Sequence, residues 1–94
     1  MFLFSGSLPS EIGRLTSLQL LGLHNNQLES QIPNELWNLT QLRALYLDGN
    51  DLKGSLPSEV SRLENIVDLR VSNNYFDGKL PDALGALSKS RLRK

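Results

Sequence analysis

The sequence predicts an α/β solenoid of 24-residue units, with short parallel strands on one face and short helical or 3₁₀ segments on the other. Two observations carry this prediction. Apolar residues recur in fixed columns along the chain, and a phrase containing each of the four prolines recurs at one constant spacing. A strict period between about 20 and 50 residues is typical of solenoids, whose units bury their apolar faces only against neighbouring units. The repeated phrases begin at Leu8, Ile32, Leu56 and Leu80.

The first part of each unit is predicted to be a short strand. Apolar and polar residues alternate there, so that Leu45 and Leu47 point inward while Tyr46 points outward. One such strand in every unit, always in the same sense, predicts a parallel sheet with one strand per turn. The inward columns are Leu18, Leu42 and Ile66; Leu21, Leu45 and Leu69; and Leu23, Leu47 and Val71.

The second part of each unit is predicted to be a loop that runs from an asparagine column to the proline. The inward amides of this column are expected to bond backbone groups of the turn, one unit after another, as a structural ladder. Glycine recurs later in the loop, where it suits a positive φ, and Ser30 replaces it in one unit. The ladder residues are Asn26, Asn50 and Asn74, and the glycines are Gly6, Gly54 and Gly78.

The third part, after the proline, is predicted to be a short helix or 3₁₀ turn. Leu36 and Leu39 are three residues apart and are expected to face inward. Trp37 is expected on the convex side as a partly buried ring over the neighbouring turn, with a lateral protein contact as the alternative. The predicted N-caps are Ser10, Asn34, Ser58 and Asp82, and acidic residues that favour a helix start follow them at Glu11, Glu35 and Glu59.

The period also divides the chain. Residues 1–88 are expected to form the repeat domain, and residues 89–94 a basic tail, because Ser90 and Arg93 fall in leucine columns. The strand near Leu20–Leu23 is predicted to be a bare sheet edge, through which the chain could associate with itself. The predicted units are a headless unit 1–17 and the units 18–41, 42–65 and 66–88.

The composition excludes several classes of function. Ten basic and ten acidic residues give a formal net charge of zero, which argues against a general nucleic-acid binder. The absence of cysteine excludes disulfides, thiol nucleophiles and zinc fingers. The chain is expected to lack a signal peptide, a membrane segment, a cofactor and a catalytic constellation. A metal site at His24, Asp48 and Asp51 is disfavoured, because one imidazole and two carboxylates make a weak signal.

The candidate binding residues flank the inward leucines, point away from the core and stack about 4.8 Å apart from unit to unit. Tyr46 beside Arg70 is the leading pair, because aromatic and guanidinium groups are enriched in binding hot spots. His24 beside Asp48 is expected to form an ordinary exposed ion pair, with pH-sensitive binding as the alternative. A plain solvated face remains the alternative for the whole surface. The candidate ligand-binding residues are His24, Tyr46, Asp48, Asp68, Arg70 and Ser72.

The unit that starts at Leu42, LRALYLDGNDLKGSLPSEVSRLEN, resembles the plant-type leucine-rich repeat, LxxLxLxxNxLxGxIPxxLxxL. The resemblance covers nearly the whole chain, and the GxIP half is specific to that subclass. It implies a curved solenoid with its sheet on a concave recognition face. Such repeats typically form the extracellular part of receptor-like kinases, receptor-like proteins and cell-wall hydrolase inhibitors. The chain departs from that pattern in having no Cys-bearing N-terminal cap and no kinase motif.

The resemblance therefore implies a non-enzymatic module that recognises a protein or peptide and lies outside the cell or at the plasma membrane. Three alternatives remain: a secreted inhibitor of cell-wall-degrading hydrolases, an intracellular scaffold, and a truncated non-functional gene product. Asn38-Leu39-Thr40 is the only N-x-S/T sequon. In this repeat family it lies in an exposed convex turn, so Asn38 is a candidate glycosylation site that favours a secretory history.

Overall fold

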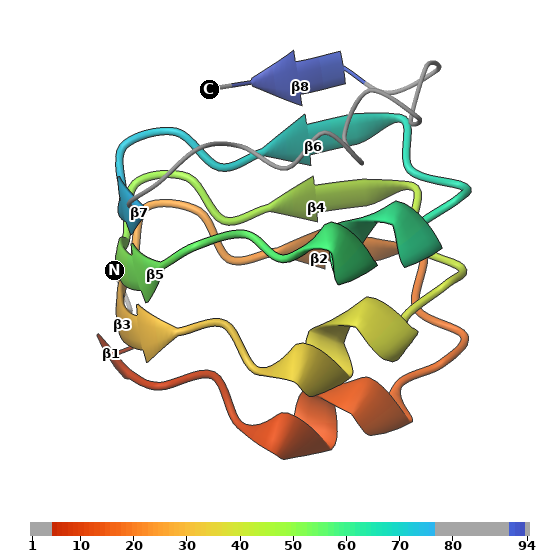
Figure 1. The fold of residues 1–94 in the computed structure, drawn as a ribbon, viewed down its shortest axis with the longest axis horizontal. Coiled ribbons are helices and arrows are strands. Elements are labelled where there is room, and N and C mark those ends of the chain that lie inside the picture. The colour runs from red at the N-terminus through yellow and green to blue at the C-terminus, as the bar shows by residue number, and fades with distance from the viewer. Residues whose placement is uncertain (1–4, 77–90, 94) are drawn as a thin grey trace.

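The computed structural model describes residues 5–76 and 91–93, which form a stack of similar turns (Figure 1). One parallel sheet contains β2 (Leu20–Gly22), β4 (Ala44–Tyr46), β6 (Asp68–Arg70) and β8 (Arg91–Arg93), in that order. A second parallel sheet contains β1 (Ser5–Gly6), β3 (Gln27–Gln31), β5 (Asp51–Gly54) and β7 (Tyr75–Phe76). The 3₁₀ helices are η1 (Ser10–Arg14), η2 (Asn34–Asn38) and η3 (Ser58–Arg62). The predicted solenoid of parallel strands and short 3₁₀ segments is confirmed.

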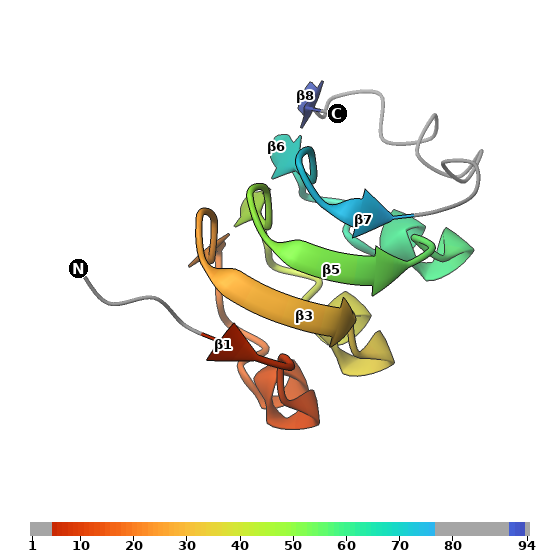
Figure 2. The same cartoon turned by 90° about the vertical axis from the view of Figure 1, so that its left-hand side faces the viewer.

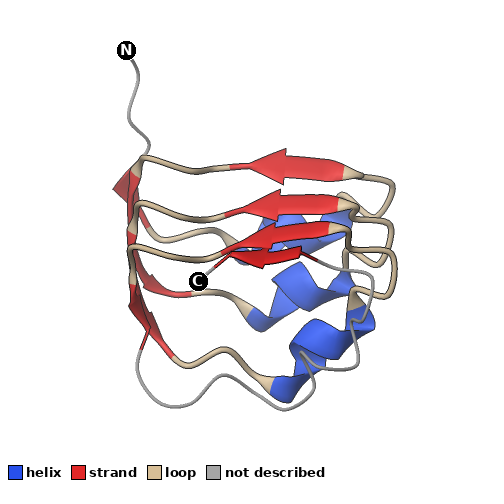
Figure 3. Cartoon of the chain, turned by 90° about the horizontal axis from the view of Figure 1, so that it is seen from above, coloured by secondary structure: helices blue, strands red, loops and turns tan. Residues whose placement is uncertain are grey.

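The predicted strands of the first sheet pair with the period of the sequence. Leu21 lies opposite Leu45, and Leu45 lies opposite Leu69, so equivalent residues stack directly. The two sheets and the helices occupy different sides of the stack (Figure 3). The buried leucine side chains of these elements form one apolar core. Each fully buried leucine contributes about 1.5–3 kcal/mol relative to an exposed one. The residues with no exposed surface are Leu36, Leu39, Leu42, Leu45, Leu47, Leu52, Val60 and Leu63.

The second sheet corrects the prediction of a loop between the asparagine column and the proline. These segments are extended and pair in parallel, as Figure 2 shows for β1, β3, β5 and β7. Glu29 lies opposite Asp51, and Lys53 lies opposite Tyr75, so partners in this sheet are closer in sequence than one repeat period. Glycine, asparagine and proline favour a loop locally. Stacking, however, places each extended segment beside the equivalent segment of the next unit, and the two segments pair because their backbone N–H and C=O groups need hydrogen-bond partners. Equivalent residues of successive units therefore do not lie directly opposite each other in the second sheet.

The 3₁₀ helices lie where the third part of each unit was predicted, but their N-caps differ from the prediction. Pro9, Pro33 and Pro57 occupy the cap positions with extended backbones, and none makes a side-chain capping bond. Proline fixes φ near the value that this extended cap requires, so the 3₁₀ turn starts directly at the residue predicted to be the cap. The Ser10 hydroxyl donates instead to Oε1 of Glu11 at 3.2 Å.

Trp37 is fully buried, with 1% of its surface exposed, so the expected partly buried ring and its lateral contact are wrong. The position of Trp37 in the repeat explains why its ring is buried. Gly13 occupies the same column, and a Cβ atom there would lie only 2.8 Å from the backbone oxygen of Glu35 in the next helix. A side chain in this column therefore enters the junction between helices rather than the convex surface.

The C-terminal strand β8 lies within the segment assigned to a basic tail. Leu92 pairs with Leu69, whereas the strict period of the sequence had placed Arg93 there. The last interval is thus one residue shorter than the others, and this aligns Leu92 with a leucine column that the fixed period missed. The predictions for Gly78, Leu80 and Asp82 lie outside the described residues.

Candidate functional site

The candidate site lies on the outward face of β2, β4 and β6, called the concave face below. The strand register aligns Gly22, Tyr46 and Arg70 in one row across the sheet. In a neighbouring row on the same face, Asp68 lies opposite Ala44. The buried Leu45 and Leu69 anchor these strands from behind, so the alternation of the strand turns the polar side chains outward. The sheet thus brings together side chains that belong to successive repeats of the sequence.

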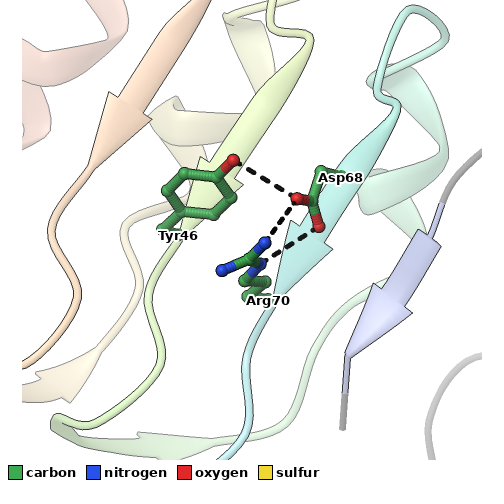
Figure 4. A network of polar contacts seen from close by, with 3 residues as sticks. All are labelled: Tyr46, Asp68 and Arg70. Atoms are coloured by element: carbon green, nitrogen blue, oxygen red, sulfur yellow. Dashed lines mark hydrogen bonds and ion pairs between the residues drawn. The ribbon is translucent and has the colours of Figure 1, made fainter.

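Tyr46, Asp68 and Arg70 form one connected polar network on this face (Figure 4). The Arg70 guanidinium donates from Nη2 to Oδ2 of Asp68 at 3.0 Å and from Nε to Oδ1 at 3.3 Å. The Tyr46 hydroxyl donates to the same Oδ2 atom at 3.2 Å. The Arg70 Cζ atom also lies 4.6 Å from the centroid of the Tyr46 ring, within cation–π range. The guanidinium is therefore held over the ring by a two-point ion pair.

The network leaves part of its surface available to a ligand. The Arg70 side chain is 43% exposed and that of Asp68 is 18% exposed. The hydrogen bond to Asp68 and the negative charge of that carboxylate raise the pKa of Arg70 above its usual value, although partial burial of the guanidinium acts in the opposite direction. Because Arg70 keeps its charge, the site presents a fixed cation that is already partly neutralised by Asp68.

His24 extends the site toward the N-terminal edge of the sheet. Its ring lies edge-on to Tyr46, with centroids 5.8 Å apart and planes at 81°. Gly22 lies between them, because a Cβ atom there would be 3.8 Å from both His24 Nδ1 and Tyr46 Cδ2. The absence of a side chain at Gly22 keeps the β2 side of the Tyr46 ring open. A glycine in an outward column was the sequence signal for this opening.

Asp48 and Ser72 lie next to the network rather than in it. The expected ion pair between His24 and Asp48 does not form within the described residues, because His24 turns its ring to Tyr46. Oδ1 of Asp48 is buried and has no hydrogen-bond partner there. Ser72 contributes its backbone carbonyl, which accepts a bond from the Gly49 amide at 3.1 Å. Sequence reasoning named Asp68 but missed that it joins Tyr46 to Arg70.

The asparagine column lies behind the turns that follow the first sheet. Asn50 is 5% exposed, and its Nδ2 atom donates to the carbonyls of Leu47 and of Leu23 in the preceding unit, both at 2.9 Å. Its Oδ1 atom accepts from the Leu28 amide at 3.1 Å. This side chain thus joins two units through groups that the sheets leave unpaired.

The other two asparagines occupy equivalent positions. Asn74 donates to the Leu47 carbonyl at 2.8 Å and accepts from the Leu52 amide at 3.0 Å. Asn26 donates to the Leu23 carbonyl at 3.0 Å. These side chains are engaged with the backbone, which agrees with a structural role.

Two further kinds of feature bear on function in the part of the chain that the structure describes. No group of three His, Cys, Asp or Glu side chains is arranged to hold a metal ion there, and no helix there is long and apolar enough to cross a membrane. Asn38 is exposed at the end of η2, away from the concave face.

Comparison with protein families gives two matches to leucine-rich repeat models, over residues 7–52 and residues 65–87, which together span most of the chain. Among curated proteins, none matches. The leucine-rich-repeat ectodomain of the membrane receptor kinase GASSHO1/SCHENGEN3 from Arabidopsis thaliana is 42% identical, with a TM-score of 0.91. That structure is a complex with CASPARIAN STRIP INTEGRITY FACTOR 2, and the match covers 96% of this chain but 11% of the receptor chain.

Two shorter relatives have similar structures. The BIR2 ectodomain from Arabidopsis thaliana is 34% identical with a TM-score of 0.88, over 94% of this chain and 46% of that one. A leucine-rich-repeat protein of Leptospira interrogans is 37% identical with a TM-score of 0.82, over 93% of this chain and 21% of that one. This chain thus spans less than half the length of each of these relatives. It belongs to the leucine-rich-repeat family, with repeats of the type found in plant receptor ectodomains.

Proposed function

We propose that this chain is a non-enzymatic recognition module that binds a protein or peptide through its concave face. The observation that carries the proposal is the Tyr46–Asp68–Arg70 network, in which a half-exposed guanidinium is fixed over an aromatic ring. A side chain that is already held in place loses little conformational entropy on binding, so its contacts contribute more to affinity. Aromatic and arginine side chains are also the groups most enriched at binding hot spots.

The similar structures support the same class of function. The GASSHO1/SCHENGEN3 ectodomain is in complex with CASPARIAN STRIP INTEGRITY FACTOR 2, and the plant peptide hormone receptor RGFR1 is in complex with RGF2. By analogy, we place this chain outside the cell or at the plasma membrane, with an extended peptide or a protein segment as its partner. The row of Gly22, Tyr46 and Arg70 crosses three strands and offers such a segment a continuous track.

The test uses peptides selected for binding to the wild-type chain from a displayed random library. We expect Tyr46→Ala and Arg70→Ala each to weaken the selected peptides by about 2 kcal/mol or more, as expected of hot-spot residues. The same variants should retain their folded circular dichroism spectra, because both side chains lie outside the leucine core and their truncation opens no cavity in it.

Arg62→Glu is the matched control on the convex side, where Arg62 ends η3 and is exposed. It should leave peptide affinity unchanged. If Arg62→Glu abolishes binding while the Tyr46 and Arg70 variants bind normally, the concave face is not the recognition surface.

A further inference from the structure

Gly22 leaves a small niche on the concave face between two aromatic rings. A Cβ atom at this position would lie 3.8 Å from Nδ1 of His24 and 3.8 Å from Cδ2 of Tyr46, which are ordinary van der Waals contacts. The two rings are edge-on to each other, with centroids 5.8 Å apart. The niche therefore offers a ligand two aromatic walls and a backbone floor.

The opposite side of Tyr46 is already occupied. β4 lies between β2 and β6, so Gly22 and Arg70 lie on opposite sides of Tyr46. The Arg70 Cζ atom lies 4.6 Å from the ring centroid, and its guanidinium is paired with Asp68 (Figure 4). A ligand side chain can therefore reach the Tyr46 ring from the Gly22 side without displacing this ion pair.

Asp48 lies in the row next to the niche. The Asn25 amide donates to the Asp48 carbonyl at 2.9 Å, so His24 and Asp48 are neighbours across the two strands. Successive rows on one face of a sheet are about 7 Å apart, because two residues along the strand separate them. The long stem of a lysine or arginine side chain can bridge the distance from the niche to Asp48.

The Asp48 carboxylate is in need of a donor. Among the described residues its Oδ1 atom is buried and has no hydrogen-bond partner, since the Arg70 guanidinium pairs with Asp68 instead. Withdrawing such an oxygen from water costs free energy that a new donor would recover. The Asp48 residue as a whole is only partly buried, so its carboxylate can turn to meet that donor.

The charges of the face favour a cationic donor. Asp48, Asp68 and Arg70 together carry one negative charge in excess. An excess of one sign attracts a ligand group of the opposite sign and repels one of the same sign. A basic segment therefore complements this part of the concave face, and an acidic segment does not.

We propose that a lysine or arginine side chain of the partner occupies the niche, with its alkyl stem between the His24 and Tyr46 rings and its charged end at the Asp48 carboxylate. The proposal rests on the recognition function proposed above and identifies the partner as a basic segment. Long basic side chains cover apolar surface with their stems while their charged ends reach a polar group. A cation beside the Tyr46 ring also gains a cation–π contact.

The first test examines the peptides selected on the wild-type chain from the displayed random library. The selected peptides should share a lysine or arginine at one position. Replacing that residue by norleucine, which keeps the stem but lacks the charge, should weaken binding about tenfold or more. If the selected peptides share an acidic residue instead and lose affinity for Arg70→Ala alone, the partner is anionic and the proposal is wrong.

The second test closes the niche with Gly22→Ala. The added methyl group fits at ordinary contact distances and Gly22 does not have a positive φ, so the midpoint of thermal unfolding should not fall. Binding of the selected peptides should weaken about tenfold or more, because the methyl group takes the place of the stem. Ser58→Thr is the matched control, since it also adds one methyl group but on the exposed start of η3, and it should bind as the wild type does.

The third test removes the charge at Asp48. Asp48→Asn should weaken the lysine or arginine peptide about tenfold or more and leave the affinity of its norleucine analogue unchanged. Equal losses for the two peptides would show that Asp48 does not meet the charged end, and this would overturn the proposal.

The niche and the recognition function fail in different ways. If Tyr46→Ala loses binding while Gly22→Ala binds as tightly as the wild type, the concave face recognises its partner without the niche, and only the niche proposal is wrong. If the library yields no binding peptide, or if neither variant changes the affinity, both proposals are wrong.

Discussion

The N-terminal end of the stack and its interior contain the same columns of residues but bury them differently. Leu15 closes its unit and is 51% exposed, whereas Leu39 in the same column is fully buried. Leu18 and Leu23 are only partly buried, whereas Leu42 and Leu47 have no exposed surface. The residue type is constant along these columns, so the difference comes from the neighbours: within residues 5–76, the interior leucines have a unit on both sides, and those near the N-terminal end have one on a single side. In a solenoid each unit completes the core of the next.

The N-terminal end also contains an apolar pocket of about 270 Å³. Its lining includes Leu8, Ile12, Leu21 and Leu28. On the other face of the edge strand β2, Leu20 is 58% exposed. Unpaired strand edges and exposed apolar side chains favour pairing with another chain. Self-association through this end stays a prediction, and size-exclusion chromatography at several concentrations would test it.

The largest expected effect separates the two regions directly. Leu39→Ala should destabilise the protein by about 2–5 kcal/mol, because it opens a cavity in a fully packed core. Leu15→Ala removes the same atoms from a half-exposed site and should cost far less. Urea unfolding of both variants measures the difference. Equal losses would show that the end of the stack is as well packed as the interior.

The interior asparagine gives the next effect. Asn50→Ala removes an acceptor for the Leu28 amide and a donor to the Leu23 carbonyl, which leaves buried backbone groups unpaired. Each such group costs about 1–3 kcal/mol. Asn50→Asp keeps the acceptor and loses the donor, so thermal unfolding should show a loss for both variants. If Asn50→Ala leaves the free energy of unfolding unchanged, water must replace the hydrogen bonds of the Asn50 side chain to these backbone groups.

The helix junctions give a third comparison. Gly13→Ala places a methyl group against the backbone of Glu35 at 2.8 Å, and overpacking of this kind typically costs about 1–3 kcal/mol. Ser61→Ala in the same column keeps an existing Cβ and should be nearly neutral. If Gly13→Ala also proves neutral in thermal unfolding, η1 can move away from η2 without cost.

The smallest effect is expected within strand β3 of the second sheet. Ser30 has a φ of 68°, where the equivalent Gly6 and Gly54 have 85° and 82°. Ser30→Gly should stabilise the protein by up to about 1 kcal/mol. Glycine removes the cost of about 1–2 kcal/mol that a non-glycine residue has in the left-handed region, but part of this gain is offset because glycine raises the conformational entropy of the unfolded chain. Ser55→Gly is the control and should be slightly destabilising, because Ser55 does not have a positive φ.

The sequence determined the repeat period, the inward leucines such as Leu45, the 3₁₀ segments and the row of Tyr46 beside Arg70. A constant period leaves few packing solutions, so identical columns must stack. Tertiary structure decided what the period does not encode. It paired the segments predicted as loops into a second sheet with a register shorter than the period, and it buried Trp37 between helices.

The candidate site shows the same division. The columns predicted that Tyr46, Asp68 and Arg70 would lie on one face, but only the register and rotamers showed that Asp68 bonds both partners. The same packing turned His24 toward Tyr46 rather than Asp48, because Gly22 leaves the space beside that ring open. A sequence pattern specifies which residues are neighbours. Which of several available partners a side chain contacts depends on the local space, and that space exists only once the units have stacked.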